Sequence, residues 1–163
     1  MAAHKEGVLL PIRIDPSRPY EFEYDDTMIT RYCGDGGEVV IPEGVTDLFF
    51  EVFSANSQIT GVRIPGSMTA VTPFVFEGCT ALRSATLEEG VCEIGCAAFR
   101  DCSALEEIVL PRSLTKIDKH ALAGCTALRS IRFGGSPEEW TRVERREGWD
   151  SDTEGYTVIP SET

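Results

Sequence analysis

A repeated unit occupies the middle of this 163-residue chain and limits what the chain can fold into. Three clear copies begin 23 residues apart, at positions 64, 87 and 110, and a weaker copy begins at 41. The units are 41–63, 64–86, 87–109 and 110–132, and a fifth begins at Phe133 and stops repeating after Trp140. Self-similarity at such a period indicates a stacked architecture, because one unit cannot bury its apolar side chains without neighbours.

Alignment of the copies gives columns that hold only apolar side chains. One column contains Phe53, Phe76, Phe99 and Leu122. Others contain Ile41, Ile64, Leu87 and Leu110, then Leu48, Val71, Ile94 and Ile117, then Val62, Ala85, Ile108 and Ile131. Stacked coils pair as parallel strands about 4.8 Å apart. The columns therefore predict a β-rich α/β solenoid with a principal strand near 82–87, a second short strand near 91–94, and a helical turn or a 3₁₀ piece at 97–100.

The charged columns agree with this stacking. Arg83, Glu106 and Arg129 share one column with alternating sign. Three further opposite pairs are Glu77 with Arg100, Glu89 with Arg112, and Glu93 with Lys116. Opposite charges on neighbouring strands stabilise a sheet slightly, so these columns predict a solvated face that neutralises itself. A binding patch is the alternative interpretation.

The spacing of one unit resembles a known repeat family. Leu82-x-x-Ala-x-Leu-x-x-x-Val-x-x-Ile-Gly-x-x-Ala-Phe-x-x-Cys102 is similar to the BspA-like leucine-rich repeat, over about residues 29–143. Ile-Pro at 41–42 and 64–65, Leu-Pro at 110–111 and the closing 133–140 segment fit the same pattern. The resemblance implies a right-handed leucine-rich repeat array and a non-enzymatic surface or secreted protein, some relatives of which serve in adhesion. Phe49-Phe50 and Glu88 depart from the pattern.

The two ends are expected to cap the array at 41–133. Residues 1–40 are expected to form an extension and a β-hairpin, in which Tyr20, Phe22 and Tyr24 share one face. Residues 134–163 are expected to form a helix and strand cap. Ser136-Pro137-Glu138-Glu139 is a strong helix start, with a Ser cap, a first-turn Pro and Glu three residues on. That helix is predicted to end near Gly148, and a last strand to include 156–159. An amphipathic helix for a partner is the alternative.

The composition limits the classes of molecule that this chain can bind. The net charge is −12, and no basic stripe interrupts it, so nucleic acid and anionic membrane surfaces are poor candidates. No segment approaches the roughly 20 apolar residues of a spanning helix. Residues 1–19 contain no signal peptide, so we expect either a cytoplasmic chain or a leader outside this sequence. A protein or peptide partner is the class that remains, with its identity and the oligomeric state left open.

Six cysteines are present, and three of them share a column: Cys79, Cys102 and Cys125. Zinc ligands lie two to four residues apart in each pair, unlike these. We expect small, buried free thiols, with disulfides and metal ligands as alternatives. Many free thiols favour a reducing compartment, in mild conflict with a surface location. Cys92 aligns with threonines and is expected to face solvent; Cys33 lies 23 residues before the column.

No catalytic constellation is visible in the sequence. His4 lies near the start, and His120 is alone in its column and expected on the surface. The 34–37 segment, Gly-Asp-Gly-Gly, lacks the lysine and the strand-loop-helix context of a phosphate loop. We therefore expect no enzyme, no cofactor and no metal.

The outward positions of the principal strands give a candidate binding face. Its expected residues are Arg63, Ser84, Thr86, Glu107, Val109, Ser130 and Arg132, with Gly61, Pro65 and Pro111 also outward. The middle column places two arginines around a neutral centre. Arginine forks pair well with carboxylates, so an acidic or extended peptide is the hypothesis. The alternative for this face is a merely solvated sheet. The alternative for the protein is an intracellular scaffold of the same fold.

Overall fold

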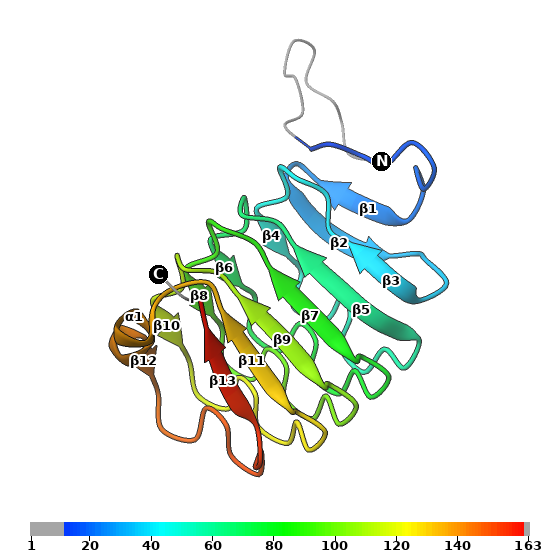
Figure 1. Ribbon diagram of the computed structural model, residues 1–163. Helices are drawn as coiled ribbons and strands as arrows, with labels where there is room; N and C mark the ends of the chain where they lie inside the picture. The colour runs from blue at the N-terminus through cyan, green and yellow to red at the C-terminus, as the bar shows by residue number, and fades with distance from the viewer. Residues whose placement is uncertain (1–11, 162–163) are drawn as a thin grey trace.

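The computed structural model describes residues 12–161, and expectations that fall on 1–11, His4 among them, or on 162–163 lie outside the described residues. Figure 1 shows successive coils stacked side by side, with the N-terminal hairpin at one end and the only helix of the described residues at the other. The coils form a parallel β-solenoid with about 23 residues per turn, and this confirms the predicted fold class.

One long side of the solenoid is a continuous six-stranded parallel sheet, in the order β13-β11-β9-β7-β5-β3. Its strands are β3 (Gly37–Val40), β5 (Ile59–Ile64), β7 (Ser84–Leu87), β9 (Glu107–Leu110), β11 (Ser130–Phe133) and β13 (Thr157–Pro160). The pairing Arg63↔Thr86↔Val109↔Arg132 matches the column alignment. The sequence period therefore sets the strand register.

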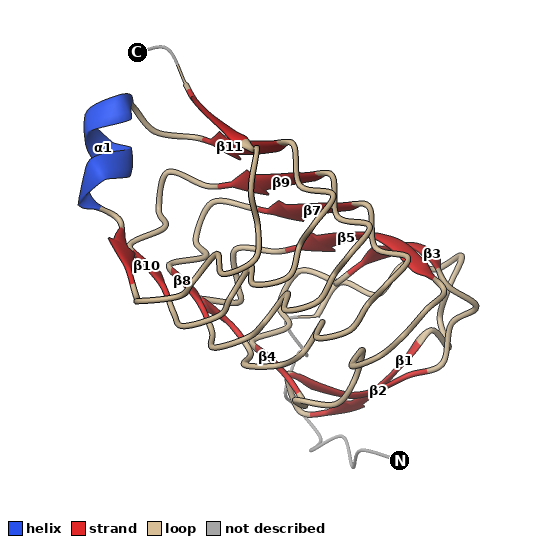
Figure 2. Cartoon of the chain, turned by 90° about the horizontal axis from the view of Figure 1, so that it is seen from below, coloured by secondary structure: helices blue, strands red, loops and turns tan. Residues whose placement is uncertain are grey.

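The second long side carries short strands in two separate sheets (Figure 2). Its strands are β4 (Asp47–Leu48), β6 (Ala70–Val71), β8 (Glu93–Ile94), β10 (Lys116–Ile117) and β12 (Glu144–Arg145). The order β12-β10-β8-β6 ends at β6, while β4 pairs with the hairpin instead. Within residues 12–161 no ladder joins β4 to β6.

The core lies between these two sides and follows the apolar columns. Phe53, Phe76 and Phe99 are almost fully buried and stack with ring centroids 5.2 and 5.1 Å apart. Leu122, the next residue of the column, has no exposed surface. Truncating such a ring costs several kcal/mol because the cavity cannot fully collapse.

The segment after each short strand was expected to be a helical turn or a 3₁₀ piece. In the structure it is a series of non-helical turns. Ala97 and Asp101 have φ of 53° and 58°, in the left-handed region that interrupts a right-handed helix. Gly78 and Gly124, with φ of 72°, occupy the same column as Asp101. Backbone bonds to the next coil offset the conformational cost at the two non-glycine residues: Ala97 N–H donates to the Lys119 carbonyl at 2.9 Å, and Asp101 N–H donates to the Ala123 carbonyl at 2.8 Å.

The N-terminal hairpin packs on the first coil. Its strands, β1 (Phe22–Asp25) and β2 (Met28–Tyr32), are antiparallel, as predicted. Phe22 is buried against the edge of the Phe53 ring, at 6.4 Å between centroids. Tyr20 is 87% exposed and precedes the strand, so the expectation that it shares the apolar face of Phe22 was wrong.

At the C-terminal end, α1 spans Pro137–Arg142 and begins with a complete capping box. The Ser136 hydroxyl accepts from Glu139 N–H, and the Glu139 carboxylate accepts from Ser136 N–H. The helix ends at Arg142 and not near Gly148. The reason is that Val143 is extended and β12 must start at Glu144 to pair with β10.

The charged columns form fewer ion pairs than predicted. Arg83 contacts Glu106 at 3.8 Å, the long end of an ion pair. Arg100 pairs with Asp101 instead of Glu77, and Arg112 pairs with Glu139 at 2.7 Å. Glu89 accepts from the Arg112 backbone N–H, which leaves the guanidinium free to hold the C-terminal helix. Long side chains thus reach past their column neighbours.

Candidate functional site

The outward face of the six-stranded sheet is built from alternate residues of each strand. In β7, Ala85 and Leu87 are buried while Ser84 and Thr86 are half-buried on the outer side. Strand β9 repeats the alternation, with half-buried Glu107 and Val109 outside, and in β11 Ser130 is half-buried and Arg132 exposed. The predicted outward residues therefore lie in register on one surface, which Figure 1 shows uncovered by other described elements.

Both arginines of this face hold a carboxylate from the same chain. Arg63 contacts Glu88 at 3.5 Å, and Arg132 donates to Glu107 at 2.8 Å. The hydrogen bond from Arg132 lowers the pKa of the Glu107 carboxyl, assisted by the Ser130 hydroxyl at 3.0 Å. The neutral centre predicted between the arginines is present, but each arginine is already paired. An acidic ligand must therefore compete with an internal carboxylate.

Three positions expected on this face are buried. Gly61 lies beneath Glu38, whose carboxylate would contact any added Cβ at 2.5 Å. Pro65 and Pro111, at the ends of their strands, are also buried. The outer surface is therefore narrower than simple alternation predicts, and its accessible part is the central column.

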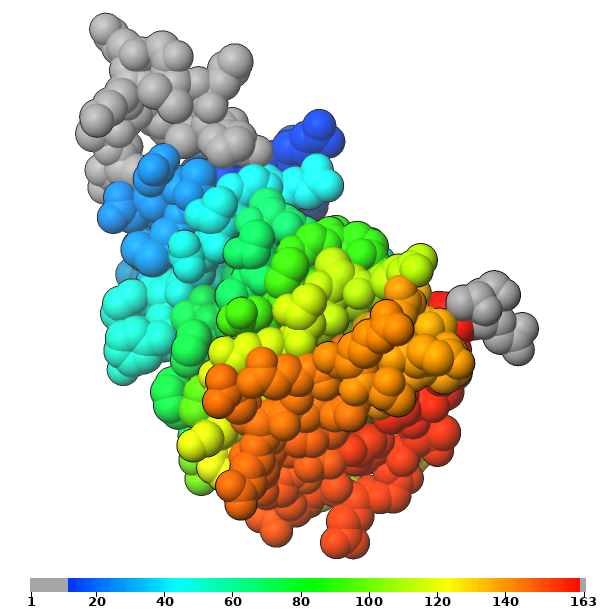
Figure 3. Space-filling model, turned by 90° about the vertical axis from the view of Figure 1, so that its left-hand side faces the viewer, coloured from blue at the N-terminus to red at the C-terminus, as the bar shows by residue number. Residues whose placement is uncertain are grey.

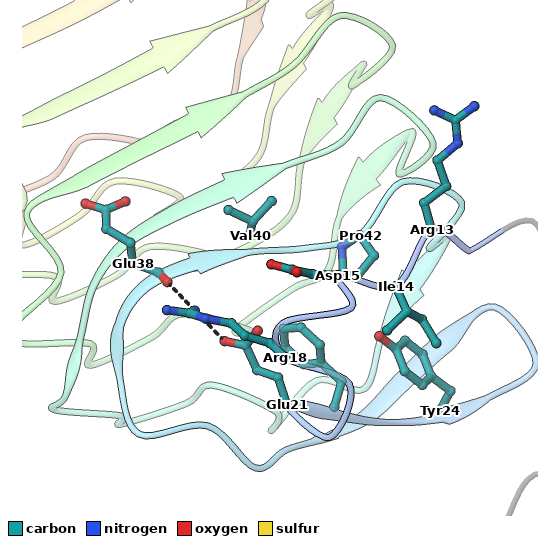
Figure 4. A pocket seen from close by; sticks show the side chains of 10 residues that line it. Arg13, Ile14, Asp15, Arg18, Glu21, Tyr24, Glu38, Val40 and Pro42 are labelled. Carbon is teal, nitrogen blue, oxygen red and sulfur yellow. Dashed lines mark hydrogen bonds and ion pairs between the residues drawn. The ribbon is translucent and has the colours of Figure 1, made fainter.

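A hollow of about 350 Å³ adjoins the N-terminal edge of this sheet (Figure 4). Its wall consists of Arg13, Ile14, Asp15, Arg18, Glu21, Phe22, Tyr24, Glu38, Val40 and Pro42. Arg18 holds the Glu21 carboxylate at 3.1 Å and the Glu38 carbonyl at 3.0 Å. Burial raises the pKa of Tyr24 to about 12 and also raises that of Glu21. Sequence reasoning missed this hollow, because it depends on how residues 12–21 cross the edge of β3.

The cysteine column is a row of free thiols in the core. The thiols of Cys79, Cys102 and Cys125 donate to the carbonyls of Phe53, Phe76 and Phe99 at 3.1–3.2 Å. Burial raises the pKa of Cys125 to about 12, and hydrogen bonding to Cys79 together with burial raises that of Cys102. Cys102 and Cys125 are therefore poor nucleophiles.

The other three cysteines differ from the column. Cys33 is exposed and lies outside the buried row. Cys92 is half-buried, and its thiol donates to the Gly90 carbonyl at 3.3 Å, so the expectation that it faces solvent is corrected. Cys96 is half-buried as well. In residues 12–161 no group of three or more His, Cys, Asp or Glu side chains is placed to hold a metal ion.

His120 is exposed, as expected, and is held at φ 57° in the column of left-handed residues. Its ring lies near Gly148 of the last coil. No helix of the described part of the chain is long and apolar enough to cross a membrane.

The family profile described as the BspA type leucine-rich repeat region matches residues 31–142, in six copies. This match covers most of the chain and coincides with the observed coils. The chain belongs to the BspA-type leucine-rich repeat family. BspA-type arrays are protein-interaction repeat modules.

Two solved structures resemble this BspA-type chain. A leucine rich cell surface protein from Faecalibacterium prausnitzii is 29% identical with a TM-score of 0.51, covering 66% of this chain and 34% of that protein. A leucine-rich repeat protein from Eubacterium ventriosum is 15% identical with a TM-score of 0.57, covering 81% and 46%, and shows the fold alone. The chain spans about a third to a half of these proteins. No curated protein sequence matches it.

Proposed function

We propose that this protein is a non-enzymatic recognition module that binds an extended peptide segment of a partner protein on the outward face of the six-stranded sheet. The observation that supports this function most strongly is the uncovered, in-register central column of that face. Solenoids commonly bind on such extended surfaces. Thr86 and Val109 offer a neutral centre on which a peptide backbone can lie.

The arginines at the two ends of the central column favour a peptide that carries acidic residues. A peptide carboxylate replaces Glu88 or Glu107 at the arginine forks, because both ion pairs are partly exposed and exposed pairs contribute little stability. Arg63 and Arg132 lie three strands apart in the ladder, with β7 and β9 between them. An extended segment with acidic residues near its two ends fits this arrangement.

A peptide-library selection tests the proposal. Random peptides are selected on the wild-type protein alone, and the selected peptides are then measured on a Thr86→Arg/Val109→Arg variant, whose centre is blocked. The selected peptides should bind Arg63→Ala/Arg132→Ala at least tenfold more weakly, with no change in melting temperature. Arg83→Ala/Arg129→Ala removes the same charge just before the strands and should bind normally. Equal binding to the blocked variant and the wild type would place recognition elsewhere.

Two opposing observations bear on the cellular location. The Faecalibacterium relative is described as a cell surface protein, and this supports a surface or secreted role such as adhesion. The six free thiols support the alternative of an intracellular scaffold, since reducing compartments keep thiols free. We favour the surface role. Protease treatment of intact cells that express the natural gene should digest the protein; full protection would favour the scaffold.

A further inference from the structure

The second long side carries three exposed phenylalanines, in two neighbouring coils, that the coil geometry does not require. Phe49, Phe50 and Phe74 are 42%, 48% and 41% exposed, although most large apolar side chains of this chain are buried. The rings of Phe49 and Phe50 lie 4.7 Å apart. Phe74 occupies the neighbouring coil, one alignment position beyond Phe50. We call Phe49, Phe50 and Phe74 the aromatic patch.

Phe74 is held in an unfavourable backbone conformation although its side chain is only partly buried. Its φ of 62° lies in the left-handed region, which is uncommon for a bulky side chain. The same column accepts Glu51, Ala97 and His120. A phenylalanine is thus not dictated by the turn, and exposing it forfeits the stabilisation of burial. Strained, exposed residues of this kind concentrate at functional sites.

The patch lies where the backbone ladder is interrupted. Phe49 and Phe50 directly follow β4, and Phe74 follows β6, the two strands that do not pair. In the other coils the residue after the short strand donates to the preceding coil, as Gly95 N–H does to the Val71 carbonyl at 2.9 Å. Among the described hydrogen bonds, Thr72 N–H makes no such bond. The gap leaves polar backbone groups beside exposed rings.

The charge around the patch is mainly negative. Asp47 and Glu51 flank the phenylalanine pair and are exposed, and Glu77 follows Phe74 in its coil. Between Arg31 and Arg100 the only basic residues are Arg63, on the six-stranded face, and Arg83, just before β7. Arg31, on β2, contacts Glu23 at 3.6 Å. An acidic rim around aromatic rings is complementary to cations that also carry apolar surface.

We infer that the aromatic patch is a second interaction surface, which binds a basic protein segment that alternates Lys or Arg with apolar side chains. The cationic groups pair with Asp47 and Glu51 or lie over the phenylalanine rings, and the apolar groups cover the rings. The free backbone N–H groups of Thr69 and Thr72, at the gap between β4 and β6, donate hydrogen bonds to carbonyls of the bound segment. This surface is distinct from the proposed peptide-binding face, so either can fail alone.

The probe is a fluorescent twelve-residue peptide that alternates lysine and leucine, with a lysine–serine and a glutamate–leucine peptide as comparisons. We expect the lysine–leucine peptide to bind at least tenfold more tightly than both. Phe50→Ser/Phe74→Ser should weaken its binding at least tenfold. Tyr20→Ser/Ile159→Ser removes two exposed apolar side chains elsewhere and should leave the affinity within twofold. Equal losses in the two variants would overturn the proposal.

Three further measurements separate the remaining outcomes. Phe50→Tyr/Phe74→Tyr keeps both aromatic rings and should bind the lysine–leucine peptide normally. This variant tests the role of the rings even if the serine variant fails to fold. Asp47→Asn/Glu51→Gln should reduce the affinity and its salt dependence, whereas Glu138→Gln/Asp152→Asn should not. In sedimentation, concentration-dependent association that Phe50→Ser/Phe74→Ser abolishes would show that a second copy occupies the patch and would refute the basic segment.

Discussion

The two long sides of the solenoid differ in continuity. On one side a parallel ladder runs through six strands without interruption. On the other side the ladder stops between β4 and β6, although Leu48 and Val71, the buried residues of these strands, are 2% and 0% exposed. The apolar column therefore continues where the hydrogen bonds do not.

This difference shows which forces hold the coils together. Side-chain burial stacks neighbouring coils even where the backbone ladder is missing, because each unit must cover the apolar columns of the next. The interruption coincides with Phe49-Phe50, the departure from the repeat pattern. Sequence variation is thus accommodated by the loops and ladder of one side, while the core columns stay intact.

The largest expected effect is on the core that both sides share. Phe99→Ala should lower the free energy of unfolding by about 3–5 kcal/mol, because the ring is fully buried beside Phe76. Phe50→Ala, at the interruption, should change it by about 0.5 kcal/mol or less, since that ring is half exposed. Urea unfolding measures both. Similar losses for the two variants would mean that the aromatic patch is part of the core.

Alkaline pH should weaken the same core. The folded state keeps Cys125 protonated to a pKa of about 12, against an ordinary value of 9.0. Stability from this group is fully present below pH 9 and falls as the pH rises from 9 to 12, because only the unfolded thiol ionises there. The expected loss is about 1 kcal/mol per pH unit.

Two controls accompany the alkaline titration. Cys125→Ala should reduce the slope without abolishing it, because the pKa of Cys102 is raised as well, whereas Cys33→Ser should not reduce it, because Cys33 is exposed. Reduced and non-reduced protein should melt at the same temperature, since the structure has free thiols at all six cysteines. A large loss of stability on reduction, or disulfides by mass spectrometry, would contradict this arrangement.

Hydrogen exchange should detect the interruption directly. Cys92 N–H and Gly95 N–H donate to the preceding coil, at 2.7 and 2.9 Å. Among the described bonds Thr69 and Thr72, their equivalents at the gap, have no backbone acceptor. We expect Thr69 and Thr72 to exchange at least about tenfold faster, because unpaired amides need no local opening. Equal protection at all four amides would show that β4 and β6 pair in solution.

Much of this fold was predictable from the columns. The 23-residue period determines the register, because a shifted coil would bring charged residues into the apolar columns. The capping box at Ser136 was also predictable from the sequence, since its residue types have a local hydrogen-bonding role. The end of α1 was not predictable from the sequence. The chain leaves the helix at Val143 because β12, which follows at once, pairs with β10, a strand distant in sequence.

The candidate site was less predictable. Alternation identified the outward residues of β7 and β9, but not the partners of long side chains. Arg112 reaches Glu139 in place of Glu89, since a guanidinium has several acceptors in range and the sequence does not rank them. The exposure of Phe74 depends on its left-handed backbone conformation, which the presence of a phenylalanine in the sequence does not predict.

The smallest effect concerns the polar face of the continuous sheet. The hydrogen bond from Arg132 holds the pKa of Glu107 below its ordinary value, so Arg132→Ala should raise that pKa toward the ordinary range. The loss of stability should stay under about 1 kcal/mol, because both side chains are partly exposed. An NMR titration of the glutamate side chains measures the pKa. Arg63→Ala should leave it unchanged, since Arg63 contacts Glu88. A Glu107 pKa that does not respond to Arg132→Ala would mean that the pair is open in solution and that Arg132 is free to bind a ligand carboxylate without competition.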